Sequence, residues 1–237
     1  MSIYLLVPAP FSAISGGYIY DRRMVEGLRA LGQDVRVVEL AGRHPFPDDV
    51  ATEAARAALA EIPAGARIVI DGLGLPAFLP FADELTTRGA VALIHHPTAL
   101  EPGAPASQRE TLKAAERVLF NACTRIITTS TPTARELPED FGVDPARISV
   151  VEPGTDPAPR ALGSAGPGCA ILSVGLLVPR KGHDVLLRAL ARLTDLDWSL
   201  AIAGDATRDP VHADGLRALA AELGIAQRIR LLGALPD

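Results

Sequence analysis

The feature that most constrains the fold of this 237-residue chain is a regular alternation of short apolar runs with longer amphipathic stretches. Most of the apolar runs are continuous, as in parallel strands that are covered on both faces. The stretches between them repeat apolar residues at helical spacing. Alternating strands and helices predict right-handed β-α-β units and a doubly wound parallel sheet. The predicted strands are residues 3–7, 35–39, 67–70, 91–95, 125–129, 148–152, 169–174, 199–203 and 228–232.

The clearest helical pattern covers residues 19–31. Met24, Val25, Leu28 and Leu31 fall on one stripe there, and Gly32 follows as a C-terminal stop signal. The same periodicity predicts six further helices between the other apolar runs. The predicted helices are residues 19–31, 48–61, 77–88, 106–121, 131–141, 183–193 and 211–223.

One stretch without periodicity, residues 152–168, interrupts the alternation. It is rich in proline, glycine and alanine, which is typical of a linker between domains. We therefore predict an N-terminal domain at 1–155, a linker at 156–168 and a second domain at 169–237. A sheet of three strands leaves an apolar edge uncovered. We expect either that the chain continues beyond Asp237 or that a partner chain completes the second domain.

Composition narrows the class of protein. The net charge of −5 and the absence of a basic stripe argue against nucleic-acid binding. The two cysteines, Cys123 and Cys169, lie in or beside apolar runs without metal-ligand spacing, which predicts buried free thiols in a reducing compartment. No basic leader or membrane-length apolar run stands out. We expect a cytoplasmic protein, with peripheral membrane contact left open.

Residues 171–193 form a strand, a cationic loop and a helix. The apolar run reaches Gly175, a loop with Arg180, Lys181 and Gly182 follows, and an amphipathic pattern then begins. Fixed positive charges beside a helix N-terminus suit an anion such as a diphosphate, although a solvated turn has the same composition. The apolar stripe expected on this helix is Val185, Leu186, Ala189, Leu190 and Leu193.

Two further groups lie where strands end. Gly16 and Gly17 follow the first strand, and two glycines let a ligand approach the backbone closely. They do not form the G-x-G-x-x-G pattern, which disfavours a nicotinamide-dependent oxidoreductase. His95 and His96, followed by Glu101, occupy the strand end at which open α/β sheets bind ligands. Either histidine suits a hydrogen bond to a sugar hydroxyl or proton transfer near neutral pH.

Taken in order along the whole chain, these motifs resemble the retaining glycosyltransferases of family 4. The resemblance implies an α/β protein with two Rossmann-like doubly wound parallel-sheet domains (the GT-B fold), of which the second is incomplete here. It implies that Gly16, Gly17 and Tyr18 lie near the donor phosphates and the acceptor. It also implies that one of His95 and His96 faces the sugar at the reaction centre, without deciding which.

The resemblance is less complete in the second domain. The family pattern Gly-Arg-Leu-x-x-x-Lys-Gly is matched by Gly175, Lys181 and Gly182, but Leu176 stands where an arginine is expected. Arg180 offers a second cation with a different geometry, since arginine binds phosphate as a planar fork. The turn at Gly204 and Asp205 resembles the family's Gly-Asp turn beside the nucleotide. The family's pair of glutamates eight residues apart would lie beyond Asp237.

The implied function is transfer of a hexose from a UDP- or GDP-sugar to a hydroxyl of a sugar, lipid or small-molecule acceptor, with retention and without cofactor or metal. The 237-residue chain itself is expected to be inactive. The alternative is a non-catalytic nucleotide-sugar-binding or assembly module completed by a partner chain. The candidate residues are His95 and His96 for catalysis, Gly16, Gly17, Gly175, Arg180, Lys181, Gly204 and Asp205 for the donor diphosphate, Tyr18 and Glu101 for the acceptor or cleft, and Gly154 and Asp156 for a hinge.

Overall fold

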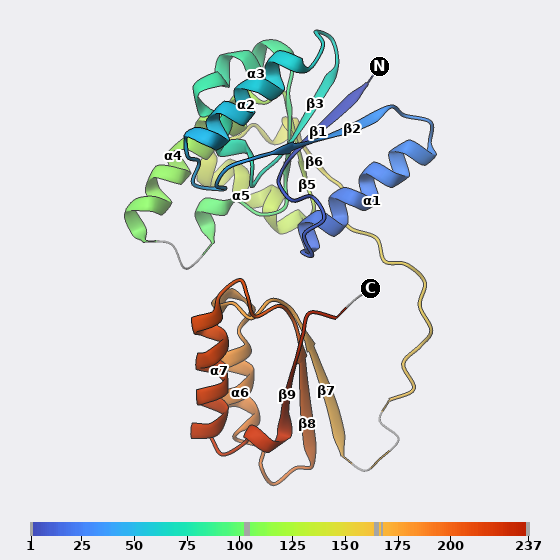
Figure 1. The fold of residues 1–237 in the computed structure, drawn as a ribbon, viewed down its shortest axis with the longest axis vertical. Helices are drawn as coiled ribbons and strands as arrows, with labels where there is room; N and C mark the ends of the chain where they lie inside the picture. Colours follow the sequence, from blue (N-terminus) through green and yellow to red (C-terminus); the bar gives the residue numbers. More distant parts are fainter. Residues whose placement is uncertain (1, 102–104, 164–165, 167, 236–237) are drawn as a thin grey trace. The chain divides into compact units, whose positions relative to one another are not determined.

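The computed structural model describes residues 2–101, 105–163, 166 and 168–235. The chain divides into two compact units, Met1–Thr155 and Asp156–Asp237 (Figure 1). One contains a six-stranded sheet and the other a three-stranded sheet, and all the strand pairs in both are parallel. The expected α/β fold with two Rossmann-like units is therefore confirmed, and the second unit has the smaller sheet.

The sheet of the first unit has the strand order β2-β1-β3-β4-β5-β6. After β1 the chain crosses to β2 on one side, whereas β3 lies on the other side of β1. Such a reversal of strand order opens a crevice outside the carboxyl ends of the strands, and ligands bind there in open α/β sheets. The bounds are β1 Ile3–Pro8, β2 Val35–Leu40, β3 Arg67–Asp71, β4 Val91–Ile94, β5 Arg125–Thr128 and β6 Ile148–Val150.

Helices cover both faces of this sheet (Figure 1). Helix α1 packs Tyr20 and Val25 against Leu5 and Val7 of β1, and α2 to α5 contribute to a larger core on the opposite face. The helix predicted at 77–88 is a 3₁₀ helix followed by an α-helix, since Pro80 lacks the N–H that a regular helix interior needs. The bounds are α1 Gly16–Ala30, α2 Asp49–Glu61, η1 Leu75–Phe81, α3 Ala82–Arg88, η2 Thr98–Leu100, α4 Ala106–Ala122, α5 Thr131–Phe141 and η3 Pro145–Arg147.

Helix α1 begins three residues before its predicted start. Ser15 is the N-cap, and its hydroxyl accepts a hydrogen bond from the N–H of Tyr18 at 3.2 Å. A serine in this position satisfies a backbone N–H that has no partner within the helix. Gly16 and Gly17, which were predicted to precede the helix, therefore lie in its first turn.

The second unit has the strand order β7-β8-β9, and Figure 1 shows α6 and α7 on the same side of the sheet. Its core joins Leu187 and Leu190 of α6 to Trp198, Leu200 and Ile202 of β8. The bounds are β7 Cys169–Val174, η4 Pro179–Lys181, α6 His183–Leu190, β8 Trp198–Ala203, α7 Pro210–Glu222, η5 Ala226–Arg228 and β9 Ile229–Gly233.

The predicted apolar stripe of α6 is partly wrong. The helix ends at Leu190, and Val185 and Leu193 are 65% and 42% exposed. The face turned to the core instead carries His183, Leu187 and Leu190, which share one side of a helix at spacings of four and three. His183 is a polar residue, so the spacing of apolar residues alone does not reveal this face.

The prediction of two buried thiols is half right. Cys123 is buried beneath the first sheet, but Cys169 is exposed. Cys169 is the first residue of β7, and β7 is an edge strand of a sheet whose two helices cover one face. On the other face of β7, Leu172 and Val174 are also exposed.

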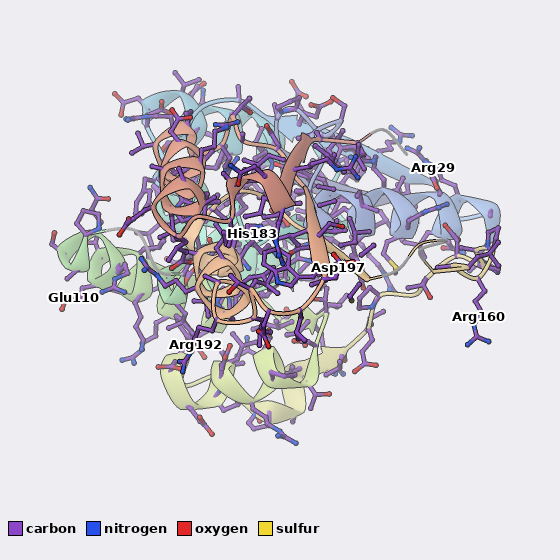
Figure 2. The ribbon with its side chains drawn as sticks, turned by 90° about the horizontal axis from the view of Figure 1, so that it is seen from below. Arg29, Glu110, Arg160, His183, Arg192 and Asp197 are labelled. Carbon is purple, nitrogen blue, oxygen red and sulfur yellow. The ribbon has the colours of Figure 1, made fainter. Side chains whose placement is uncertain are left out.

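Irregular backbone runs through residues 151–163, which contain neither helix nor strand. Charged side chains such as Glu110 on α4 and Arg192 after α6 lie at the surface (Figure 2). No helix in the described part of the chain is both long and apolar enough to cross a bilayer. A small set of polar side chains is nevertheless buried: Asp21, Asp71, Glu116, Thr128, Thr133 and His183.

Candidate functional site

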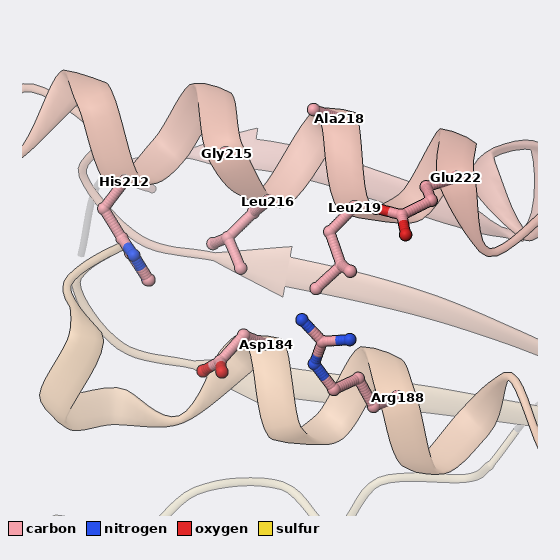
Figure 3. Close-up of a pocket in the computed structure, with 8 residues that line it drawn as sticks. All are labelled: Asp184, Arg188, His212, Gly215, Leu216, Ala218, Leu219 and Glu222. Carbon is pink, nitrogen blue, oxygen red and sulfur yellow. The ribbon is translucent and has the colours of Figure 1, made fainter.

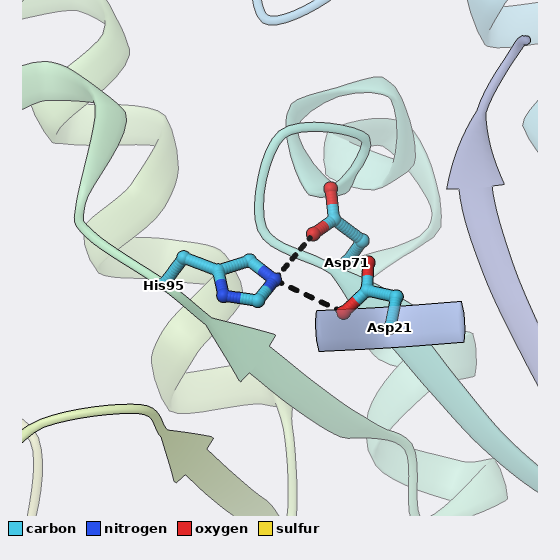
Figure 4. Close-up of side chains that lie close together, drawn as sticks. All are labelled: Asp21, Asp71 and His95. Carbon is cyan, nitrogen blue, oxygen red and sulfur yellow. Dashed lines mark hydrogen bonds and ion pairs between the residues drawn. The ribbon is translucent and has the colours of Figure 1, made fainter. Parts of the chain in front are cut away.

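Two of these buried carboxylates meet a partly exposed histidine at the carboxyl edge of the first sheet (Figure 4). His95 directly follows β4, Asp71 ends β3, and Asp21 projects from the second turn of α1. The Nε2 atom of His95 lies 3.0 Å from Oδ1 of Asp21 and 3.6 Å from Oδ2 of Asp71. One ring nitrogen is therefore directed at both carboxylates, close to the switch point of the sheet.

Burial and charge together determine the protonation of this cluster. The side chains of Asp21 and Asp71 are 0% and 5% exposed. Burial, and secondly the charge of Asp21, raises the pKa of Asp71 to about 7. Burial would lower the pKa of His95, but the hydrogen bond and charge of Asp21 and the charge of Asp71 raise it overall. The cluster therefore favours bound protons near neutral pH.

The surrounding residues fix the position of the histidine. The ring of Tyr20 meets the His95 ring edge to face, with centroids 5.3 Å apart. A Cβ atom on Gly17 would lie only 3.2 Å from Cδ2 of His95, so the first turn of α1 approaches the ring closely. The hydroxyl of Thr133 donates to the backbone carbonyl of His95 at 3.4 Å, and that of Thr129 lies 3.5 Å from the same oxygen. The structure thus brings Gly17 and His95 together.

Within the described part of the chain, this cluster brings three carboxylate or imidazole groups within 4.8 Å of one another. The shortest distance in the cluster, 3.0 Å between Nε2 of His95 and Oδ1 of Asp21, is a hydrogen-bond distance. Oδ1 of Asp71 accepts the N–H of Leu73 at 2.9 Å and is already satisfied. A proton on Nε2 of His95 accounts for the short contact with Asp21.

The other candidates of the first unit lie apart from this cluster. His96 lies at 3.8 Å from a carboxylate oxygen of Glu136 and is about one-third exposed. Glu101 caps the C-terminus of η2 and faces Glu116, whose pKa its charge helps to raise. The hydroxyl of Tyr18 donates to the carbonyl of Pro8 at 2.9 Å, which ties it to the end of β1.

In the second unit, the predicted donor residues gather where β7 and β8 end. A Cβ atom on Gly175 would lie 3.3 Å from Cδ of Lys181, so the lysine stem lies over the glycine backbone. A Cβ atom on Gly204 would overlap the carbonyl oxygen of Gly175. Gly182, at a φ of 65°, ends η4 and precedes α6. The loop thus brings an ammonium group to the N-terminal end of a helix.

Two polar groups fix the shape of this loop. His183 is buried, with Nε2 at 3.2 Å from the carbonyl of Leu176 and Nδ1 at 3.4 Å from the Ser173 hydroxyl. The carboxylate of Asp205 accepts both the N–H and the hydroxyl of Thr207 at 2.8 Å. Asp205 therefore shapes the turn after β8, while the side chain of Arg180 is exposed.

The predicted hinge residues, Gly154 and Asp156, lie in the irregular stretch, and both are exposed. The division between the two units falls beside them, after Thr155.

A pocket of about 360 Å³ lies elsewhere in the second unit, along the seam of α6 and α7 (Figure 3). Asp184 and Arg188 line it from α6, and His212, Leu216 and Glu222 line it from α7. None of the predicted donor residues is among its lining residues. We therefore do not assign the donor site to this pocket.

Sequence patterns missed Asp21, Asp71 and Tyr20 as partners of His95. Asp21 is four residues from both Gly17 and Val25, which places a carboxylate on the apolar side of an amphipathic helix. Asp71 directly follows the apolar residues Ile68–Ile70. A charged residue in either position is costly unless it has a partner, and this signal could have identified both.

Comparisons with known proteins agree with the fold. The family model described as Glycosyltransferase Family 4 matches residues 14–159, and the model described as Glycosyl transferases group 1 matches residues 157–237. A D-inositol 3-phosphate glycosyltransferase of Thermomonospora curvata is 32% identical over 180 residues, which make up 63% of this chain and 42% of that protein. The chain thus spans about two-fifths of the length of this relative.

Solved structures show the same fold. A sucrose-phosphate synthase of Thermosynechococcus elongatus superposes with a TM-score of 0.75 at 19% identity, covering 99% of this chain and 70% of that one. The Anabaena protein HepE in complex with UDP-glucose gives a TM-score of 0.63 at 17% identity, covering 99% of this chain and 70% of that one. Because a family model matches more than half of its residues, this chain belongs to glycosyltransferase family 4.

Proposed function

We propose that this chain carries the acceptor-side domain and part of the donor-side domain of a retaining transferase that moves a hexose from a nucleotide-diphosphate sugar to an acceptor hydroxyl. The observation that carries the proposal is the loop after β7, where Lys181 lies over Gly175 at the start of α6. Backbone N–H groups at a helix N-terminus and an adjacent ammonium group stabilise an anion. A departing nucleoside diphosphate is such an anion.

In this proposal, catalysis depends mainly on electrostatic stabilisation of the leaving group. Lys181 and Arg180 neutralise charge on the diphosphate, while Gly175 makes room for the stem of Lys181 and Gly204 lets the ends of β7 and β8 approach closely. Gly16 and Gly17 contribute from the first unit, with His95 or His96 at the sugar and Tyr18 and Glu101 towards the acceptor. Gly154 and Asp156 serve as the hinge. No metal ion is required, because the loop supplies the positive charge.

The donor and acceptor classes are suggested by relatives. HepE was solved with UDP-glucose, and the inositol 3-phosphate glycosyltransferases act on a phosphorylated polyol by name. We therefore propose UDP- and GDP-hexoses as donors and a sugar, lipid or small polyol as acceptor, in the cytoplasm. Lipid acceptors would bring the protein to a membrane surface without a membrane span.

The test replaces Lys181 with alanine in a longer form of the protein that has a complete second domain. Nucleotide release from UDP- and GDP-hexoses should fall at least about tenfold, because a charge on the leaving group is lost. Arg188→Ala, which removes an exposed cation from α6 outside the loop, should have little effect. Unchanged turnover in Lys181→Ala would contradict the assignment of the loop. Retention is checked from the anomer of the product by NMR, and metal independence from turnover in EDTA.

A second candidate function is a non-catalytic nucleotide-sugar-binding or assembly module. The observation that favours it is the three-stranded second sheet of a chain that spans two-fifths of its relative's length. Calorimetry of the 237-residue chain with UDP and GDP separates the two functions. A transferase that needs further sequence should bind both weakly, whereas tight binding without turnover would favour the module.

A further inference from the structure

We propose that Asp21 and Asp71 are positioning residues that hold His95 as an imidazolium with Nε2 turned inward, so that it meets its ligand through Nδ1–H as a cationic hydrogen-bond donor. His95 then does not act as a base, because an imidazolium has no free lone pair. The identity of the ligand as a sugar or phosphate oxygen rests on the proposed function, whereas the charge and orientation of the ring do not.

The orientation follows from the contacts of the ring. Nε2 is the ring atom that faces both carboxylates, at 3.0 Å and 3.6 Å. Figure 4 shows the other ring nitrogen on the side away from them. The edge of Tyr20 and the contacts of Thr129 and Thr133 with the His95 carbonyl restrict rotation of the ring and its backbone.

The charge follows from the lack of other cations. Among the described residues, no lysine or arginine forms an ion pair with Asp21 or Asp71. Oδ2 of Asp21 is buried and has no hydrogen-bond partner there. Two enclosed carboxylates without a counter-charge are strongly unfavourable. A proton on His95 supplies the counter-charge to both at once.

Among the groups around the ring, Asp71 competes for this proton, because burial and then the charge of Asp21 raise its pKa to about 7, whereas the remaining neighbours do not. From α1, Tyr20 faces the ring, but its hydroxyl donates to the carbonyl of Val151 at 2.9 Å, and burial and then the charge of Asp21 raise its pKa. The neighbours after β5 and in α5 are the uncharged Thr129 and Thr133. The titratable groups that face Nε2 are thus Asp21 from α1 and Asp71 from β3.

The open side of the ring is what a ligand would meet. The side chain of His95 is 25% exposed, and Nδ1 has no hydrogen-bond partner among the described residues. Nδ1 of His95 is not one of the buried side-chain atoms that lack a hydrogen-bond partner, which is consistent with access to solvent. An N–H of an imidazolium donates a charge-assisted hydrogen bond, which is about twice as strong as a neutral one. It suits a hydroxyl or phosphate oxygen at the carboxyl end of β4.

The test follows the ring nitrogens of His95 by long-range ¹H–¹⁵N NMR in the 237-residue chain from pH 5 to pH 9, with His95→Gln for assignment. At pH 7 both nitrogens should carry a proton. Asp71→Asn and Asp21→Asn should each move the titration midpoint of His95 down by about one pH unit, since each removes a neighbouring negative charge. Glu136→Gln, which changes the carboxylate beside His96, should leave that midpoint in place.

Each outcome decides the proposal. A neutral His95 ring at pH 7, or an unchanged midpoint in both aspartate variants, would overturn it. If Asp21→Asn does not fold by circular dichroism, the wild-type spectrum and Asp71→Asn still decide. Loss of the His95 titration on adding Zn²⁺ or Mg²⁺ would assign the cluster to a metal ion instead. Failure of the transferase function would leave these spectra unchanged, and a negative NMR result would leave the loop at Lys181 as proposed.

Discussion

At the scale of single residues, Glu116 of α4 shows how an enclosed charge can stabilise local structure. It is 1% exposed, and its carboxylate accepts the backbone N–H groups of Thr98 and Ala99 at 2.8 Å and 3.2 Å. These bonds hold η2 close behind the two histidines. Burial nevertheless outweighs them and raises the pKa of Glu116 to about 7.

This shift predicts a pH dependence of stability. The native state binds a proton on Glu116 more tightly than the unfolded state, so the unfolding free energy of the first unit should fall as the pH rises from about 4.5 to about 7. Glu116→Gln cannot ionise and should lose this pH dependence, so its unfolding free energy relative to the wild type should rise by up to about 3 kcal/mol between pH 4.5 and pH 8. Its NH2 group cannot accept one of the two backbone N–H bonds, which lowers its stability by a similar amount at every pH. This pH dependence of the unfolding free energy is measured by urea unfolding at several pH values, with tyrosine fluorescence as the probe.

The control is Glu110→Gln, which changes an exposed residue of the same helix and should leave the slope against pH unchanged. Asp71 titrates in the same pH range and is present in all these proteins, so it does not affect the comparison. Equal slopes for the wild type and Glu116→Gln would show that Glu116 does not titrate in this range.

At the scale of elements, the contact between the ends of β7 and β8 determines the shape of the cationic loop. Gly204→Ala should destabilise the second unit by more than about 2 kcal/mol, because its Cβ would overlap the carbonyl oxygen of Gly175 and the backbone must move. Trp198 is the single tryptophan of the chain and is buried in this unit, so its fluorescence in urea reports on the second unit alone.

The matched control is Gly215→Ala in the middle of α7. Nothing lies within 4 Å of the added Cβ there, and alanine should stabilise the helix by about 0.5–1 kcal/mol. If both glycine variants unfold at the wild-type urea concentration, the close approach of the two strand ends is not needed for stability.

The uncovered face of the second sheet leads to another prediction at this scale. Leu172 and Val174 of β7 are 63% and 74% exposed and lie next to each other on the face away from α6 and α7. Adjacent apolar side chains on an edge strand favour self-association. The chain should form oligomers at high concentration by sedimentation velocity, and Leu172→Lys with Val174→Lys should return it to a monomer.

Val185→Lys is the control for this surface, because Val185 is similarly exposed but lies on α6. It should leave the association unchanged. A wild-type chain that stays monomeric at high concentration would show that the uncovered face does not drive association.

Elements were more predictable than the contacts that join them. The alternation of runs predicted the nine strands found among the described residues, because parallel strands that are buried on both faces are mostly continuous apolar runs. Of the predicted site residues, His95 directly follows β4, and Lys181 lies in the loop between β7 and α6. Asp21 and Asp71 were missed because their partnership joins α1 to β3 across the fold, and periodicity within one element carries no information on such a contact.

At the scale of the whole molecule, the two units have separate cores and differ in how well they are covered. Both faces of the first sheet are packed by helices, whereas the second sheet is packed on one face. A small domain buries a smaller fraction of its surface and is less stable. The second unit should therefore unfold at a lower urea concentration than the first.

The chain carries its own probes for this prediction, because its three tyrosines, Tyr4, Tyr18 and Tyr20, lie in the first unit and Trp198 lies in the second. In urea, the change in tryptophan fluorescence should precede the change in tyrosine fluorescence, and circular dichroism should show both steps. A fragment of residues 1–155 should retain the tyrosine transition at the same midpoint, since its core does not use residues of the second unit. Coincident transitions, or a fragment that does not fold, would instead show that the two units unfold as one cooperative system.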